Sequence, residues 1–250
     1  MSSRMFHIIG MTWNPITGCL HGCLYCWARR LVNTRLKNKK KYRMGFRPTF
    51  HEHELKVKFR PNEMVFVADM GDMWGIWVPK EWILKVLNHI SKFNDTTFLL
   101  LTKNPARYLE FKDALVSMPN VILGSTIETD DSELYRKHGI SKAPPPDERI
   151  RAMVKLRDMD FTNLMVSIEP VLDFTHSFDD AIAEIDPMFV YVGYDNYNHR
   201  LPEPPLSKVR TLIRHLRSMG IVVHEKTIRP AWYERKRNNI GYMHSILDWT

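Results

Sequence analysis

The stretch TGCLHGCLYC, residues 17–26, contains every cysteine of the chain. Cys19, Cys23 and Cys26 lie within these ten residues, and the 224 residues that follow contain no further thiol. Three thiols in one short segment, with none elsewhere, indicate that the three side chains share one task. Their spacing, C-x3-C-x2-C, therefore guides the interpretation of the rest of the sequence.

The composition is that of a globular protein. Hydrophobic residues make up 44% and aromatic residues 11% of the 250 residues, which is enough for a sizeable core. No charged segment precedes an apolar run as in a signal peptide, and no apolar run reaches the roughly 18 residues that a membrane span needs. We therefore expect a cytoplasmic protein with no membrane partner, whose cysteines stay reduced.

The net charge of +8 is concentrated near the cysteines. Residues 1–60 contain 13 Lys and Arg against two acids, whereas the remaining 190 residues contain 23 against 26. Residues 29–47 contain no acid, and aromatic residues interleave with their positive charges. Such a stretch predicts contacts with a polyanion such as a nucleic acid, while a solvated surface and a dock for an acidic protein are the alternatives. Its candidate substrate contacts are Lys39, Lys40, Lys41 and Arg43.

Six short apolar runs follow the cysteine segment and predict strands that are buried on both faces. They cover residues 64–69, 97–102, 121–127, 164–170, 188–194 and 220–226. Around and between them, apolar residues at helical spacing predict helices. These helices cover residues 26–38, 79–93, 104–118, 146–159, 176–186 and 205–220.

Strand and helix therefore alternate about six times, which is typical of βα units and a parallel sheet. The predicted fold class is α/β, a partial or closed parallel (βα) barrel with about six βα units. We expect one domain over 1–250, with a basic segment at 29–60 and a C-terminal extension from about 228 to 250. Residues 142–148, KAPPPDE, predict a loop and not a domain boundary.

Polar residues follow each predicted strand. Active sites of such folds gather at the carboxyl ends of the parallel strands, so these residues are candidates for the lining of a cavity. Polar residues begin the loops of any fold, and each one alone is therefore weak evidence. The candidates are Asp69, Gly71, Asp72, Gly75, Thr102, Lys103, Ser125, Thr126, Glu128, Ser167, Glu169, Asp173, Gly193, Asp195, Asn196, His224, Glu225 and Lys226.

The three cysteines allow two kinds of metal site. A structural zinc site needs a fourth ligand, which His21 or a distant histidine would supply. A [4Fe-4S] cluster has four irons, so three cysteines would leave one iron open to another ligand. If the site is such a cluster, the absence of a fourth cysteine indicates a function in which the open iron binds a ligand.

The segment CLHGCLYC resembles the cluster motif of the radical S-adenosylmethionine (SAM) enzymes, which has an aromatic residue before the last cysteine. The longer segment TWNPITGCLHGCLYCWARR (12–30) is similar to the phage Gp37/Gp68-like (DUF5131-type) branch of that superfamily, and SIEPVLD (167–173) resembles a later motif of the branch. The chain departs from the branch twice. Only three residues separate the first two cysteines, and Gly193, Tyr194 and Asp195 stand where a Gly-Gly-Glu is common.

The resemblance implies a partial (βα)6 barrel with the cysteine motif after its first strand. It implies a [4Fe-4S] cluster with Cys19, Cys23 and Cys26 as its metal ligands and as the catalytic residues. The open iron would bind SAM, and an electron from a flavodoxin or ferredoxin would cleave SAM to methionine and a 5′-deoxyadenosyl radical. That radical would abstract hydrogen from a substrate.

By position, the resemblance also implies contacts with both molecules. The SAM contacts are Tyr25, Met70, Gly71, Asp72, Ser125, Thr126, Ser167, Glu169 and Gly193. The substrate contacts are Lys103, Glu128, Tyr194 and Asp195, and a nucleic acid or nucleotide is the candidate substrate. The alternatives are a zinc- or Fe–S-containing nucleic-acid-binding protein without radical catalysis, and a barrel whose cluster only carries or senses electrons.

Overall fold

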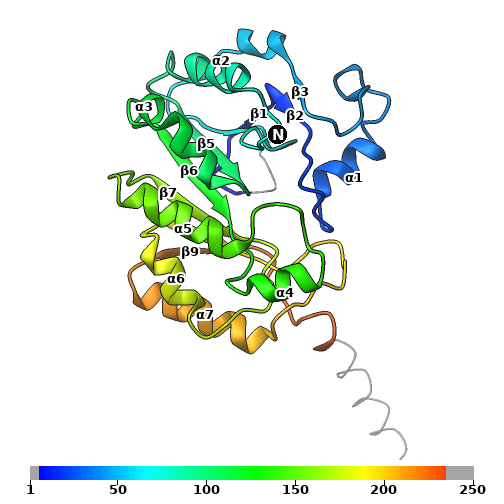
Figure 1. Cartoon of the computed structure of the whole chain (residues 1–250), viewed down its shortest axis with the longest axis vertical. Helices are drawn as coiled ribbons and strands as arrows, with labels where there is room; N and C mark the ends of the chain where they lie inside the picture. The colour runs from blue at the N-terminus through cyan, green and yellow to red at the C-terminus, as the bar shows by residue number, and fades with distance from the viewer. Residues whose placement is uncertain (1–5, 235–250) are drawn as a thin grey trace, which may run out of the picture.

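A seven-stranded parallel sheet forms the centre of the protein, here described from a computed structural model that covers residues 6–234. Helices flank this sheet, and the cysteine segment lies beside it (Figure 1). The strands follow one another across the sheet in the order β1 (Met11–Trp13), β4 (Met64–Val67), β5 (Thr97–Thr102), β6 (Val121–Thr126), β7 (Leu164–Ile168), β8 (Phe189–Val192) and β9 (Val222–Glu225). A separate antiparallel pair joins β2 (Ile16–Thr17) to β3 (Thr49–Phe50).

The helices follow the predicted order, but the structure has one α-helix, α4, that the prediction lacks. The α-helices are α1 (Trp27–Asn33), α2 (Lys80–Ile90), α3 (Lys112–Leu115), α4 (Ser132–Lys137), α5 (Pro146–Arg157), α6 (Phe178–Glu184) and α7 (Leu206–Ser218). The 3₁₀ helices are η1 (Lys40–Tyr42), η2 (Glu52–Lys56) and η3 (Pro105–Phe111). No described helix is long and apolar enough to cross a membrane.

Two of the predicted helix ranges were wrong. The first helix ends at Asn33 instead of residue 38. The predicted helix over 104–118 is a 3₁₀ helix followed by one short α-helical turn. The buried Arg107 and Tyr108 of this segment donate to carbonyls of neighbouring elements, among them Val78 O at 2.9 Å and Leu100 O at 2.8 Å. These tertiary bonds override the helical periodicity of the sequence.

Successive side chains of a strand point to opposite faces, and this alternation separates two cores. Outward-facing residues such as Val65, Leu100 and Val166 pack in the large core that includes the helices. Inward-facing residues form a smaller cluster inside the curved sheet: Phe66, Leu99, Ile122, Met165, Phe189 and Tyr191, joined by Phe6 and Ile9 of the N-terminal segment. No ladder joins β1 to β9 in the described residues, so of the two predicted forms, partial or closed, the barrel has the partial one.

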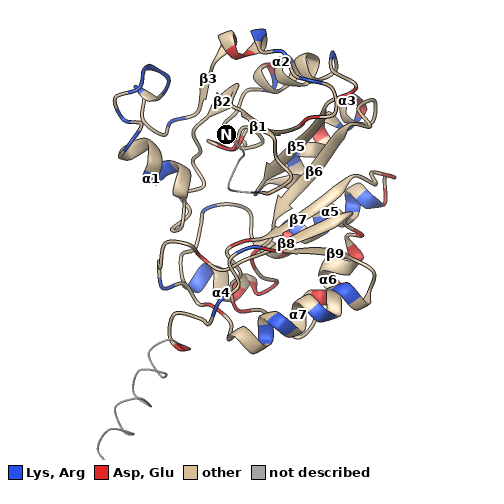
Figure 2. Cartoon of the chain, turned by 180° about the vertical axis from the view of Figure 1, so that it is seen from behind, with Lys and Arg blue, Asp and Glu red and all other residues tan. Residues whose placement is uncertain are grey.

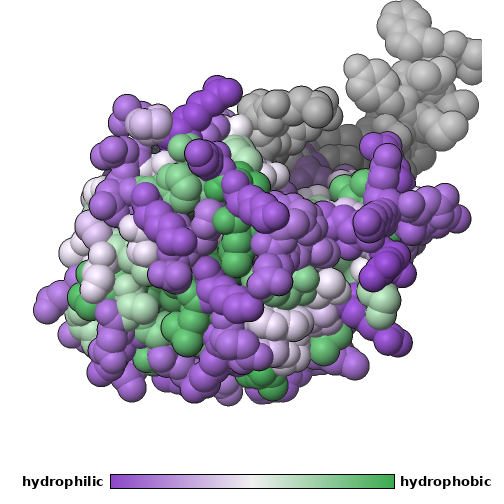
Figure 3. Space-filling view, turned by 90° about the horizontal axis from the view of Figure 1, so that it is seen from above, coloured by the Kyte–Doolittle hydropathy of each residue, from purple (hydrophilic) through white to green (hydrophobic). Residues whose placement is uncertain are grey.

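The surface is mainly hydrophilic on the face seen from above, with smaller hydrophobic areas between charged side chains (Figure 3). This agrees with a chain in which 26% of residues are charged. The predicted C-terminal extension, from about 228 to 250, is described only as far as residue 234.

Backbone contacts clamp the base of the cysteine loop. Gly18 N donates to Met70 O at 2.9 Å, Asp72 N donates to Gly18 O at 3.3 Å, and Gly18 forms a parallel bridge with Gly71. Gly18 has φ +85°, a conformation that favours glycine. A Cβ on Gly71 would lie 2.8 Å from both Gly18 N and Gly18 O, so this close approach needs a glycine.

We predict that Gly71→Ala displaces the cysteine loop and lowers the free energy of unfolding by about 1–3 kcal/mol, because the new methyl group meets rigid backbone. Urea unfolding and the rate of thiol labelling measure the two effects. Gly10→Ala is the matched control, since its new methyl would meet only the side chain of Glu63, at 3.2 Å. Equal unfolding midpoints for the two variants would contradict the prediction.

Candidate active site

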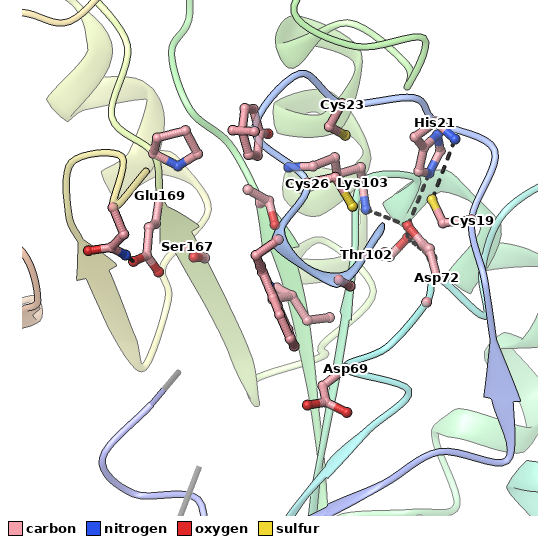
Figure 4. Close-up of a pocket in the computed structure, with 18 of the residues that line it drawn as sticks. Cys19, His21, Cys23, Cys26, Asp69, Asp72, Thr102, Lys103, Ser167 and Glu169 are labelled. Atoms are coloured by element: carbon pink, nitrogen blue, oxygen red, sulfur yellow. Dashed lines mark hydrogen bonds and ion pairs between the residues drawn. The ribbon is translucent and has the colours of Figure 1, made fainter. Parts of the chain in front are cut away.

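A cavity of about 730 Å³ lies at the carboxyl ends of the strands, between the sheet and the cysteine loop (Figure 4). Phe6, Phe66 and Leu101 line its apolar part. The polar lining residues lie two or four positions after inward-facing residues of the strands, and therefore face the same side. Lys103 follows Leu101, Ser167 and Glu169 follow Met165, Thr126 follows Gly124, and Lys226 follows His224.

All three cysteines line this cavity as free thiols. Figure 4 shows them on one side, with Ser167 and Glu169 across from them. Each sulfur has a polar partner: His21 N donates to Cys19 Sγ at 3.4 Å, Arg29 N donates to Cys26 Sγ at 3.4 Å, and Ser141 Oγ lies 3.1 Å from Cys23 Sγ. Burial is the main cause that raises the pKa of Cys19 and of Cys26.

The thiols do not form a site for one metal ion. Within residues 6–234, no three His, Cys, Asp or Glu side chains are grouped so that they could hold a single ion. His21, the suggested fourth zinc ligand, instead lies with its Nε2 3.0 Å from Asp72 Oδ2. A cluster of several irons takes its thiolates on different irons, so its ligands need not converge on one point. Iron–sulfur clusters are held by cysteine thiolates, and three free thiols that line one cavity are a donor set of that kind.

Asp72 ties the cysteine loop to the sheet. Its carboxylate is buried and accepts from Thr102 Oγ1 at 2.8 Å and from the backbone N–H of Lys103 at 3.0 Å, in addition to its contact with His21. Burial by itself raises the pKa of Asp72, but the bonds from His21, Lys103 and Thr102 outweigh it and lower that pKa. Asp72, predicted to contact SAM, thus lines the cavity with its carboxylate already bonded within the protein.

Glu128 is the buried centre of an ion-pair network beneath the cysteine loop. Lys103 Nζ lies 2.7 Å from Oε1, Arg149 Nη1 lies 2.6 Å from Oε2, and the hydroxyl of Tyr25 also donates to Oε1. Burial by itself raises the pKa of Glu128, but Arg149 and Lys103 outweigh it and lower that pKa to about 2. The network fixes Tyr25, the residue before Cys26, through a carboxylate that stays ionised.

The opposite wall holds a second ion pair. Lys226 Nζ lies 2.6 Å from Glu169 Oε2, and Asn196 Nδ2 donates to Glu169 Oε1 at 3.4 Å. Burial raises the pKa of Glu169, and Lys226 offsets part of that rise. A Cβ on Gly193 would lie 3.1 Å from the Cβ of Lys226, so glycine there lets the end of β9 approach Glu169.

Asp69 also lines the cavity, although the predicted cofactor and substrate contacts did not include it. Ala68 has φ +59°, which ends the alternation of β4 one residue before Asp69. Asn14 Nδ2 donates to Asp69 Oδ1 at 2.6 Å and its Oδ1 accepts from Met70 N at 2.9 Å. Burial raises the pKa of Asp69. The signal in the sequence was Asn14, which belongs to the TWNP segment.

The structure brings most, but not all, of the predicted site residues together. Those that line the cavity are Cys19, Cys23, Tyr25, Cys26, Gly71, Asp72, Lys103, Thr126, Ser167, Glu169, Tyr194 and Asp195. Met70, Ser125, Glu128 and Gly193 are not part of its lining.

Alternation explains one of these differences, and packing explains another. Ser125 precedes the inward-facing Thr126 and therefore faces the helices, where it is fully buried and its Oγ has no hydrogen-bond partner among the described residues. Met70 packs against Ala28 and Val32 of α1. The predicted substrate contacts of the basic segment also lie outside the cavity, and Lys41 pairs with Glu54.

We predict that Glu128→Gln lowers the free energy of unfolding by about 3 kcal/mol at pH 7, because it leaves the buried Arg149 without its anionic partner. Glu133→Gln, at an exposed position of α4, is the control and should change little. Urea unfolding at several pH values makes the comparison.

The pH dependence gives a second check. The pKa of Glu128 falls from an ordinary 4.5 to about 2 in the folded chain. Its stabilising contribution is therefore complete above pH 4.5 and is lost as the pH falls toward 2. The difference between the wild type and Glu128→Gln should shrink over that interval, and a difference that stayed constant would argue against an ionised Glu128.

Comparison with solved structures relates this fold to spore photoproduct lyase. A complex of that lyase with dinucleoside spore photoproduct matches with a TM-score of 0.55 at 10% identity, over 84% of this chain and 75% of the lyase. A mutant lyase with the same dinucleoside matches with a TM-score of 0.58 at 12% identity, over 84% and 75%. A mutant with bound AdoMet and the dinucleoside matches with a TM-score of 0.50 at 12% identity, over 83% and 60%. At these identities the likeness establishes the fold, the partial barrel of the radical SAM type.

Sequence comparisons give the family. No curated protein matches the chain. The profile of DUF5131, described as a protein of unknown function, matches residues 6–193, which include the cysteine loop and the strands from β1 to β8. The chain therefore belongs to the DUF5131 family.

Proposed function

We propose that the protein is a radical SAM enzyme, in which Cys19, Cys23 and Cys26 hold a [4Fe-4S] cluster and the cavity binds SAM beside it. One observation carries this proposal: the only three thiols of the chain share one wall of a cavity at the carboxyl ends of the strands. The fold, shared with a lyase that has been seen with bound AdoMet, supports it. Because of the TWNP and SIEP segments, we place the chain in the Gp37/Gp68-like branch.

When bound, such a cluster supplies the single electron that cleaves SAM into methionine and a 5′-deoxyadenosyl radical. The chain's own residues prepare the site. The backbone N–H groups of His21 and Arg29 donate to two of the sulfurs, and hydrogen bonds to sulfur help set the reduction potential of a cluster. Cys23 is buried and Cys19 and Cys26 are half-buried, which limits the access of water to the thiols.

The remaining walls offer the groups that SAM requires. Thr126 and Ser167 present hydroxyls, and Glu169 presents a carboxylate that can accept from ribose hydroxyls. Gly71 lines the cavity next to the cysteine loop, where its backbone lies against that of Gly18. We assign these four residues to SAM. The electron would come from a flavodoxin or ferredoxin.

The first prediction from this proposal tests the cluster. Any one of the changes Cys19→Ala, Cys23→Ala or Cys26→Ala should abolish both the iron–sulfur chromophore and the release of 5′-deoxyadenosine, because each removes one of the only three thiolate ligands. Anaerobic reconstitution, iron and sulfide assays and chromatography of the products make the measurement. Leu24→Ala, on the same loop and half exposed, is the control that should keep both. About four irons per chain in Cys23→Ala would sink the assignment.

The second prediction tests where SAM binds. Ser167→Ala should weaken SAM binding to the reconstituted protein about fivefold, the usual value of one hydrogen bond. Ser125→Ala, on the neighbouring strand but facing the helices, should not change the affinity. Titration calorimetry measures both variants. Equal affinity of wild-type protein with and without the cluster would show that the cysteine wall takes no part in SAM binding.

A further inference from the structure

The basic residues after the cysteines belong to a loop that leaves and rejoins the wall of the cavity. Trp27 and Ala28 of α1 line the cavity on one side of this loop, and Phe46 lines it on the other. Between these points the chain projects away from the sheet, and Figure 2 shows its Lys and Arg residues in blue beyond α1. Whatever the loop binds is therefore held beside the mouth of the cavity.

This basic loop, residues 34–47, carries seven Lys and Arg and no acid. Lys41 pairs with Glu54, and it is the one member for which the described residues provide an ion pair. The other six are exposed: Arg35, Lys37, Lys39, Lys40, Arg43 and Arg47. Their charges are thus available to a ligand with a row of negative charges.

An aromatic side chain stands at the cavity mouth beside the same segment. Tyr197 lines the cavity, yet it is 48% exposed. The guanidinium of Arg30, on α1, lies 5.0 Å from the centre of the Tyr197 ring. A partly exposed ring with an arginine over it is a surface on which a nucleobase can stack.

We propose that the substrate is a single-stranded nucleic acid, whose phosphates contact the basic loop and one of whose nucleotides enters the cavity past Tyr197. The chemistry done there rests on the proposed function, but the binding does not. A cavity of about 730 Å³ is in the range that holds a drug-sized ligand, so a polymer can present only one unit to it. A duplex keeps its bases stacked and out of reach.

The composition of the loop favours nucleic acid over an acidic redox protein. Lysine is depleted in protein–protein interfaces, whereas phosphates are contacted by lysine and arginine alike. Three of the loop's residues are consecutive lysines, Lys39 to Lys41.

Fluorescence anisotropy with the full chain and labelled oligonucleotides of about 20 nucleotides tests the proposal. Single strands of DNA and RNA should bind more tightly than the matching DNA duplex. The triple variant Lys39→Gln, Lys40→Gln and Arg43→Gln should lose at least about tenfold in affinity at about 0.1 M salt, and its salt slope should fall by about 2. The control removes the same charges from exposed positions on outer helices: Lys112→Gln, Lys155→Gln and Arg210→Gln. It should bind like the wild type.

Variants of Tyr197 distinguish stacking at the cavity mouth from general electrostatic attraction. Tyr197→Ala should lower the single-strand affinity about fivefold or more while leaving the salt slope unchanged, and Tyr197→Phe should bind normally, because stacking needs only the ring. Thermal unfolding of every variant checks that the fold is intact.

Three results would overturn the proposal. The first is oligonucleotide binding by the wild type that does not depend on salt. The second is an equal loss of affinity in the control triple variant. The third is a preference for duplex DNA that Tyr197→Ala does not alter. A fourth would redirect it: intact oligonucleotide binding in the basic-loop variant, with SAM cleavage by flavodoxin reduced relative to cleavage by dithionite, would identify an electron-donor dock. Failure of SAM cleavage in wild-type protein with normal oligonucleotide binding would reject only the proposed function.

Discussion

The alternation of side chains along parallel strands is the constraint on which the site depends. Residues 99 and 101 of β5 face the inside of the partial barrel and are apolar, and the next inward position is Lys103. Strand β7 repeats the order with Met165, Ser167 and Glu169. Because neighbouring strands pair in register, the change from apolar to polar occurs at about the same height on each strand. As a result, the inside of the partial barrel is apolar below this height and polar above it.

Charge burial is the second constraint, and it explains why the cavity is preorganised. Its two lysines, Lys103 and Lys226, each have a carboxylate partner, and Glu128 is held by Arg149 as well. Leaving any of these charges without a partner in a buried setting would cost several kcal/mol. The pairs therefore hold the cysteine loop, through Tyr25, and the end of β9, through Glu169, in fixed places before any ligand arrives.

The sequence predicted the fold better than it predicted individual site residues. Six apolar runs predicted a partial or closed (βα) barrel, because buried parallel strands produce continuous apolar runs, and the family resemblance of the cysteine segment implied the partial form. The same runs hide which residues face inward, so Ser125 and Thr126 were equivalent candidates until the register was known. Asp69 and Glu128 were candidates because each follows a strand, but the positive φ of Ala68 and the pair of Glu128 with the distant Arg149 could not be predicted from the sequence. The segment at 104–118 was mistaken for one helix because Arg107 and Tyr108 bond to other elements.

Charge is divided differently inside and outside the cavity. Inside, each lysine is neutralised by a carboxylate, so the walls exert little net attraction on a polyanion. Outside, the basic loop keeps six exposed cations without acidic neighbours in residues 34–47. In nucleic-acid recognition, phosphate contacts supply affinity and contacts to the bases supply specificity. The division in this chain matches that scheme: under our proposal the loop holds a polymer of any sequence, and the polar cavity selects the unit that enters it.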